Sequence, residues 1–275
     1  MPRRLLFIVA LLATVLVACG GTAAKPALTD PKEILANTAS SLTNLKSVHI
    51  KATVTGKIDS GSLSGGSTGA GLPIDLTGTT LEGDIDIADS EAKLAVSVPA
   101  LLGFSADLIA TGGQAYVKTS LNPDGKYHKI DLASMTNGLP LPSLPAGAAS
   151  PDPSAVAAAL DQFKAELDKL PAPTKLADEK IGDQDCYHVQ IKVNSSDIPQ
   201  ASGVLNGATG SVTVDVWTRK SDYRPARINV AVDGGTAGNL AITIDLTNYD
   251  APVTVTPPPA DQISDQPFSI PGLTP

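Results

Sequence analysis

The chain has 275 residues and a formal net charge of −8, and aromatic residues make up only 4% of it. An acidic chain lacks the basic face that nucleic acids and anionic membrane surfaces require, so both are excluded as electrostatic partners. The length fits one large domain or two small ones, and the scarcity of aromatic residues means that the core is aliphatic.

The N-terminus has the pattern of a bacterial secretion signal. Two arginines precede an apolar run over residues 5–18, which is shorter than the roughly 20 residues of a membrane span. The run ends in Leu-Val-Ala-Cys at Cys19, which resembles the lipobox of bacterial lipoproteins, where the signal is cleaved and the cysteine is diacylated. We therefore predict a lipoprotein signal peptide over 1–18, lipidation of Cys19 and a flexible tether over 19–29. This places the protein on the outer, extracytoplasmic face of the cell membrane, held by its lipid.

The first predicted element after the tether is a helix over 31–46. Asp30 is a favourable N-cap, Pro31 suits the first helical position, and apolar residues then recur at helical spacing. From position 47 the period changes to two, which predicts a half-buried strand over 48–55.

The first half continues as strands separated by turns. A Gly/Ser-rich stretch over 60–71 predicts a loop, and Gly112-Gly113 predicts a hairpin turn. The predicted strands cover 81–88, 93–98, 104–110, 114–119 and 127–132.

The middle of the chain is irregular and is followed by a second helix. Prolines alternate with leucines within 135–153, which excludes a regular helix or a central strand there. A helix begins at Pro153, and its apolar residues step by three and four, as an amphipathic helix requires. Its apolar face consists of Val156, Leu160, Phe163, Leu167 and Leu170.

The second half returns to alternating strands, followed by a proline-rich, extended tail after Pro252. The predicted strands cover 175–181, 185–193, 211–218, 226–233 and 239–248. Short turns between successive strands favour an antiparallel meander. We therefore predict an α+β fold in which a curved antiparallel sheet is covered by helices on its concave face, as a single domain over 30–275.

Catalytic and metal-binding patterns are weak in this chain. His49, His128 and His188 fall in predicted strands without the spacing of metal ligands, and we interpret them as surface residues. Cys186 and His188 share a strand face, so a Cys/His dyad is conceivable, but a buried thiol beside a surface histidine is the simpler interpretation. We predict no enzyme, no metal and no cofactor.

An acidic run over 84–89 contains Asp84, Asp86 and Asp89, which raises calcium binding as an alternative. The run lacks the glycine turn and the distal glutamate of a calcium loop, so a solvated strand face is the preferred interpretation. Two apolar stretches, over 98–104 and 139–144, break the expectation that loops are polar. They either cap the core or line an apolar cavity, and the sequence leaves both open.

The whole pattern resembles the LppX/LprA/LprF/LprG lipoprotein family, best known from mycobacterial envelopes. The similarity starts with the lipobox, the tether, the first helix and Ser-Val-His-Ile at 47–50. It continues in order with Asp-Cys-Tyr-His-Val at 185–189, Val-Asp-Val-Trp at 214–217, Arg-Pro-Ala-Arg at 224–227 and Asn-Tyr-Asp-Ala-Pro-Val at 248–253.

The resemblance implies a half-open antiparallel barrel with an apolar cavity between the sheet and its helices. In that family the cavity takes the acyl chains of lipids and glycolipids, which are carried outward across the envelope, in some members with a membrane transporter. The alternative is a lipid-anchored binding module, a sensor or adhesin, with a solid core. The cavity candidates are Val48, Ile50, Leu94, Val96, Val98, Val189, Ile191, Val214, Val216, Ile242 and Ile244 on the sheet, with Val156, Leu160, Phe163 and Leu167 opposite.

Overall fold

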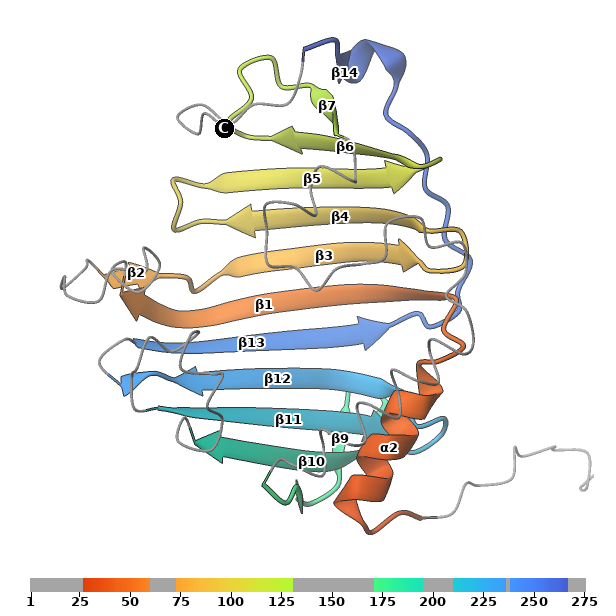
Figure 1. Ribbon diagram of the computed structural model, residues 1–275, viewed down its shortest axis with the longest axis vertical. Coiled ribbons are helices and arrows are strands. Elements are labelled where there is room, and N and C mark those ends of the chain that lie inside the picture. Colours follow the sequence, from red (N-terminus) through yellow and green to blue (C-terminus); the bar gives the residue numbers. More distant parts are fainter. Residues whose placement is uncertain (1–26, 60–72, 131–170, 195–209, 236–237, 267–275) are drawn as a thin grey trace, which may run out of the picture.

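The computed structural model describes residues 27–59, 73–130, 171–194, 210–235 and 238–266. These residues form one curved, mostly antiparallel sheet with a helix, α2 (Pro31–Ser41), across one end (Figure 1). The strands are β1 (Ser47–Asp59), β2 (Pro73–Asp75), β3 (Thr79–Asp86), β4 (Glu91–Val98), β5 (Phe104–Thr111), β6 (Gln114–Thr119), β7 (Tyr127–Ile130), β8 (Thr174–Lys175), β9 (Glu179–Ile181), β10 (Gln184–Asn194), β11 (Ser211–Arg219), β12 (Pro225–Asp233), β13 (Gly238–Thr247) and β14 (Ile263–Ser264), and a 3-10 turn, η4 (Ala260–Gln262), precedes β14.

Two antiparallel meanders make up the sheet. One runs from β3 to β7 and the other from β10 to β13, and β1 joins them because it pairs with both β3 and β13. Short turns connect β3 to β4, β4 to β5, β5 to β6 and β11 to β12, as the meander prediction requires. The described strand order begins at β14 and ends at β8, so this sheet does not close on itself, and β14 pairs with β7 in parallel.

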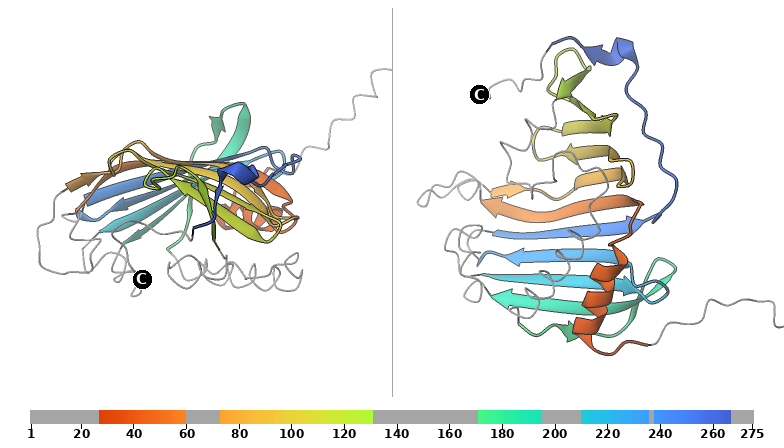
Figure 2. Two further views of the ribbon diagram at one scale, coloured as in Figure 1. Left: turned by 90° about the horizontal axis from the view of Figure 1, so that it is seen from above. Right: turned by 45° about the vertical axis from the view of Figure 1, so that its right-hand side comes forward.

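The sheet is curved along its strands, as the view from above shows (Figure 2). Glycine lets β1 bend sharply where it meets β13. Gly56 has φ +118°, and a Cβ at this position would lie 2.2 Å from the Asn239 carbonyl oxygen. A shift of register between Trp217 and Thr218 adds a further irregularity in β11. Bends of this kind turn a flat ladder into a trough.

Helix α2 begins as predicted and ends earlier. The Asp30 carboxylate accepts a hydrogen bond from the backbone N–H of Lys32 at 2.9 Å, and Pro31 occupies the first turn. The prediction of a helix to position 46 is wrong at its C-terminus, because Leu42 caps the helix. Tightened turns follow, such as Thr43 N–H to the Ser40 carbonyl at 3.3 Å, and turn the chain into β1.

Most predicted strands are present with ends shifted by a few residues. The predicted strand over 175–181 is wrong, because the chain leaves β10 after Leu176 and returns only at Glu179. The Asp178 carboxylate holds this excursion by ion pairs with Lys175 at 2.6 Å and Lys220 at 2.7 Å. The tail after Pro252 is extended, but β14 at its end was not predicted, since two residues carry no period.

Several predictions fall outside the described residues. These are the signal peptide, Cys19, the loops over 60–71 and 135–153, and the second helix with Val156, Leu160, Phe163 and Leu167. The domain limits 1–18, 19–29 and 30–275 also stay predictions. Among the described helices, α2 included, none has the length and hydropathy of a membrane span.

Candidate functional site: the aliphatic face of the sheet

The strand register decides which side chains share a face. Directly paired residues of an antiparallel ladder point to the same side, so one row of partners can be followed across the sheet. The row through the middle of β1 crosses from β10 to β5 and is aliphatic throughout: Val189, Val216, Ile228, Ile244, Ala52, Leu81, Val96 and Ala106. We call this side the aliphatic face and the opposite side the polar face.

All the sheet residues that we predicted from the sequence to line a cavity lie on the aliphatic face. The register places Val54 beside Ile242 and Ile50 beside Leu246. The predicted cavity residues outside these rows, Val48 and Val98, alternate in phase with Ile50 and Val96 along β1 and β4 and so share the same face. The full set is Val48, Ile50, Leu94, Val96, Val98, Val189, Ile191, Val214, Val216, Ile242 and Ile244. Their common face follows from period-two alternation, but whether they touch lipid stays a prediction.

Sequence reasoning omitted several residues of the same face. Alternation in β12 and β5 is as regular as elsewhere, so their inward positions could have been nominated by the same rule. The omitted residues are Ala52, Leu81, Leu108, Val117, Ile228, Val230 and Leu246.

Helix α2 packs against the β10–β11 end of this face (Figure 1). Ile34 and Val189 meet there at 0% exposure, within a cluster that also contains Leu35 and Val216. The hydroxyls of Thr38 and Thr218 lie 2.7 Å apart and satisfy each other in this buried contact. This end of the aliphatic face is a packed core.

The chain before α2 is held at the same end. Leu28 is buried in the cluster, and its backbone N–H donates to the Tyr187 hydroxyl at 3.0 Å. Leu28 lies within the predicted tether over 19–29, so the last residues of that segment belong to the fold.

The middle of the aliphatic face is less buried than the α2 end. Side chains of the same types, on the same face, stay half-buried over β1, β3, β4, β12 and β13. The half-buried candidates there are Ile50, Leu94, Val96, Val98, Ile242 and Ile244, whereas Val48 on β1 is buried. Val214 on β11 is also half-buried, but it packs against the α2 cluster. An apolar surface that is left partly accessible in this way can bind an apolar ligand.

Over β1, β3, β12 and β13 the polar face carries charged pairs rather than aliphatic side chains. Lys51 Nζ lies 3.0 Å from Glu82 Oε2, and Arg227 Nε donates to Asp245 Oδ1 at 2.6 Å. Cross-strand pairs of opposite charge stabilise a solvated sheet surface. The sheet therefore has one side suited to water and one side suited to hydrocarbon.

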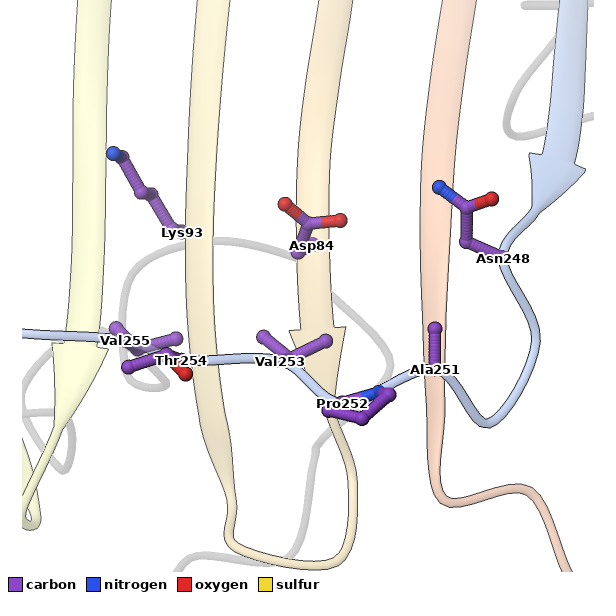
Figure 3. A pocket seen from close by; sticks show the side chains of 8 residues that line it. All are labelled: Asp84, Lys93, Asn248, Ala251, Pro252, Val253, Thr254 and Val255. Carbon is purple, nitrogen blue, oxygen red and sulfur yellow. The ribbon is translucent and has the colours of Figure 1, made fainter.

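The C-terminal tail crosses the polar face and forms a pocket there. Val253 and Val255 pack towards Ile109 and Tyr116 of β5 and β6. A pocket of about 160 Å³ lies beneath this segment, beside Asp84 and Lys93 (Figure 3). A second, more open pocket of about 380 Å³ lies on the same face over small residues of β1, β11, β12 and β13. The apolar cavity expected on the aliphatic face stays a prediction.

The structure corrects the interpretation of His188 as a surface residue. Its ring is 6% exposed and stacks on Trp217 with a centroid distance of 4.3 Å. Nε2 lies 2.9 Å from Asp215 Oδ1, and Nδ1 lies 3.3 Å from Glu179 Oε1. Glu179 of β9, the strand paired with the start of β10, contacts both His188 and Trp217, which the sequence pattern could not reveal. Cys186 is fully buried, burial raises the pKa of its thiol, and its sulfur donates to a backbone carbonyl. Both imidazole nitrogens face carboxylates, which does not support the dyad.

His128 also departs from the prediction, whereas His49 agrees with it. His128 is buried on the aliphatic side of β7, because its ring contacts the Gln266 carbonyl at 3.0 Å and Asp124 at 3.3 Å. His49 lies on the polar face with Nδ1 2.8 Å from Asp84 Oδ1. Within the described residues, no three His, Cys, Asp or Glu side chains converge as metal ligands.

The apolar stretch over 98–104 divides into two parts. Val98 and Phe104 are half-buried at the ends of β4 and β5, whereas Leu101 is 52% exposed and Leu102 is fully exposed. Exposed leucines do not cap a core, so that interpretation is wrong for the two leucines. The second stretch, over 139–144, lies outside the described residues.

An unclosed antiparallel sheet with one continuous aliphatic face defines the class of fold. A model of the LppX_LprAFG lipoprotein family matches residues 30–255. The chain therefore belongs to this family, which places it among lipid-binding lipoproteins of the envelope.

Two mycobacterial proteins are among the solved structures that match the chain. LprF from Mycobacterium bovis has 19% sequence identity, with 83% of this chain and 96% of that chain covered and a TM-score of 0.49. Lipoprotein LppX from Mycobacterium tuberculosis has 15% identity, with 82% and 98% covered and a TM-score of 0.49. No curated protein matches the sequence.

Proposed function

We propose that this protein is a lipid-anchored envelope carrier that binds the acyl chains of lipids or glycolipids against the middle of the aliphatic face. The observation that carries the proposal is the partial burial of that region in a chain of a lipoprotein family. Acylated Cys19 would fix the protein to the outer face of the cell membrane. The protein would then release its lipid outward across the envelope, with or without a membrane transporter.

The driving force is the transfer of methylene groups from water to an apolar surface, about 0.8 kcal/mol for each one. The row through Ile244, Ala52, Leu81 and Val96 offers a continuous strip of side chains across several strands. An extended acyl chain can lie against such a strip without meeting a charge. Aliphatic side chains suit flexible chains because they impose no stacking geometry.

The rest of the fold keeps the strip available. Helix α2 is fixed to β10 and β11 by the fully buried Ile34 and Val189 and by the Thr38–Thr218 contact. It therefore covers one end of the face and anchors the sheet curvature there. The paired charges of the polar face hold the opposite side in water, so the sheet has one side available for lipid.

Mass spectrometry of an organic extract of purified protein tests the proposal. The protein is the chain from residue 19 onward with Cys19→Ala, which retains every described residue and lacks the acylation site. We expect stoichiometric acylated lipid in the wild-type extract. Protein that is repeatedly empty after expression in an envelope that contains such lipids contradicts the proposal.

A pair of adjacent substitutions in β4 supplies the control. Val96→Thr places a hydroxyl on the aliphatic face with nearly unchanged shape, and we expect several-fold less bound lipid. Ser97→Thr adds a methyl group on the polar face of the same strand and should leave occupancy unchanged. Equal losses in both variants would show that the aliphatic face is not the binding surface.

A second function is supported by the pockets of the polar face. The pocket of about 380 Å³ is lined by small side chains, including Thr55, Thr213 and Ala231. A lipid-anchored binding module would use such a surface for a protein or glycan while the aliphatic face served as core. This alternative would be favoured if organic extracts of the purified protein contain no lipid and a Thr213→Arg variant loses binding to the protein or glycan partner.

A further inference from the structure

The turn between β4 and β5 presents two leucines to solvent. Leu101 is 52% exposed, and Leu102 is fully exposed. The turn is held by its backbone, because Leu101 N–H donates to the Val98 carbonyl at 3.1 Å and Phe104 N–H to the Leu101 carbonyl at 2.9 Å. The exposure is therefore built into a hydrogen-bonded hairpin tip.

Leu102 also has an unfavourable backbone conformation. Its φ of +54° lies in the left-handed region, which favours glycine or asparagine and is uncommon for a bulky side chain. Gly103 follows in the same region with φ +75°. A leucine here has neither the freedom of glycine to adopt a positive φ nor the polar side chain with which asparagine would bind water. Strain combined with apolar exposure points to a contact made outside the folded domain.

The tip and the strand residues on either side of it carry no charged side chain. No charged residue occurs from position 94 to position 106, whereas the turn at the other end of β4 contains Asp89 and leads into Glu91, the first residue of β4. A third exposed leucine, Leu121, lies beside the tip, since Ser120 N–H donates to the Ser105 carbonyl at 2.8 Å. The two ends of the hairpin therefore differ sharply in polarity.

We propose that this tip, formed by residues 99–103 with Leu121 beside it, inserts into the interface of a lipid bilayer. The occupant is a bilayer rather than a protein, because the tip has no charged or hydrogen-bonding side chain through which a protein partner could be recognised. An uncharged hairpin enters hydrocarbon without desolvating an ion.

The position of the tip links it to the aliphatic face. Val98 and Phe104 are paired at the tip ends of β4 and β5 and share the face with Val96. The tip therefore adjoins the aliphatic face at the rim of the sheet. This inference rests on the proposed function for its biological purpose, the exchange of lipid with a membrane, but its test does not.

The test measures cosedimentation with phosphatidylcholine vesicles, using the chain from residue 19 onward with Cys19→Ala. We expect salt-insensitive binding of the wild type and at least a tenfold lower partition coefficient for Leu101→Ser/Leu102→Asn. Asparagine suits the positive φ, so this variant should fold. Leu42→Ser, which removes an exposed leucine beside α2 at the other end of the strands, is the matched control and should stay within twofold of wild type.

Each outcome separates the two proposals. Absence of wild-type binding, or equal losses in the tip and Leu42→Ser variants, overturns membrane insertion even if lipid copurifies. If vesicle binding depends on the tip but the purified protein never contains lipid, membrane insertion is supported and the proposed carrier function is overturned. If the double variant fails to fold, Leu102→Gly alone, which relieves the strained backbone, must lower binding by a measurable factor for the inference to stand.

Discussion

The α2 end and the middle of the aliphatic face are built from the same side-chain types in the same register, yet they differ in burial. Val189 has 0% exposure beneath α2, whereas Val96, on the same face and in the same cross-sheet row, is half-buried. The difference shows that strand alternation creates an apolar face but does not determine what covers it. Where α2 covers the aliphatic face, the face is a core that stabilises the fold. Where the face stays accessible, it is a surface that can bind lipid.

Paired valine substitutions test this comparison most directly. Val189→Ala should lower the free energy of unfolding by about 2 kcal/mol, because it leaves a cavity in a packed contact. Val96→Ala should cost about 1 kcal/mol or less in delipidated protein, since its site is already partly accessible. Urea unfolding of both variants measures the difference. Equal costs would mean that the whole face is one packed core.

The threonine contact between α2 and β11 gives the next largest effect. Thr218→Val leaves the Thr38 hydroxyl with its Ile34 carbonyl partner at 2.8 Å but removes the 2.7 Å contact between the hydroxyls. We expect a loss of about 1 kcal/mol for the single variant and a smaller additional loss when Thr38→Val is added. A double-mutant cycle with strictly additive losses would show that this contact does not fix α2.

The turn after β13 supplies a pH-dependent comparison. The Lys46 backbone N–H, and then Arg224, lower the pKa of Asp250 below its usual value. A lowered carboxyl pKa contributes stability above the unfolded pKa of about 3.9, and this is lost as pH falls through the folded value. The side chain is 32% exposed, so after solvent screening Asp250→Asn should cost only about 0.5 kcal/mol at pH 7. Unfolding at pH 7 and pH 3 should show the difference shrinking, and a constant difference would exclude the ionised carboxylate as its cause.

Leucine-to-glycine substitutions at the two ends of the strands should have small effects of opposite sign. Leu102→Gly relieves a left-handed residue and should stabilise the domain by about 0.5 kcal/mol. Leu42→Gly should destabilise it by a similar amount, since Leu42 has φ −90° and gains nothing from glycine. Thermal unfolding measures both, and a loss on Leu102→Gly would show that the leucine contributes to stability in the free protein.

The sequence by itself determined the strand alternation, the helix start at Asp30 and the common face of the nominated sheet residues, because these depend on local period and capping. The lipobox at Cys19 and the order of motifs likewise indicated the lipoprotein family, which the family match confirms. Tertiary structure alone decided the burial of His128 and His188, since the C-terminal segment and β9 reach them from elsewhere in the chain. It also decided that α2 covers one end of the face and that the β4–β5 turn exposes Leu102, because burial depends on contacts between distant segments that a local pattern does not encode.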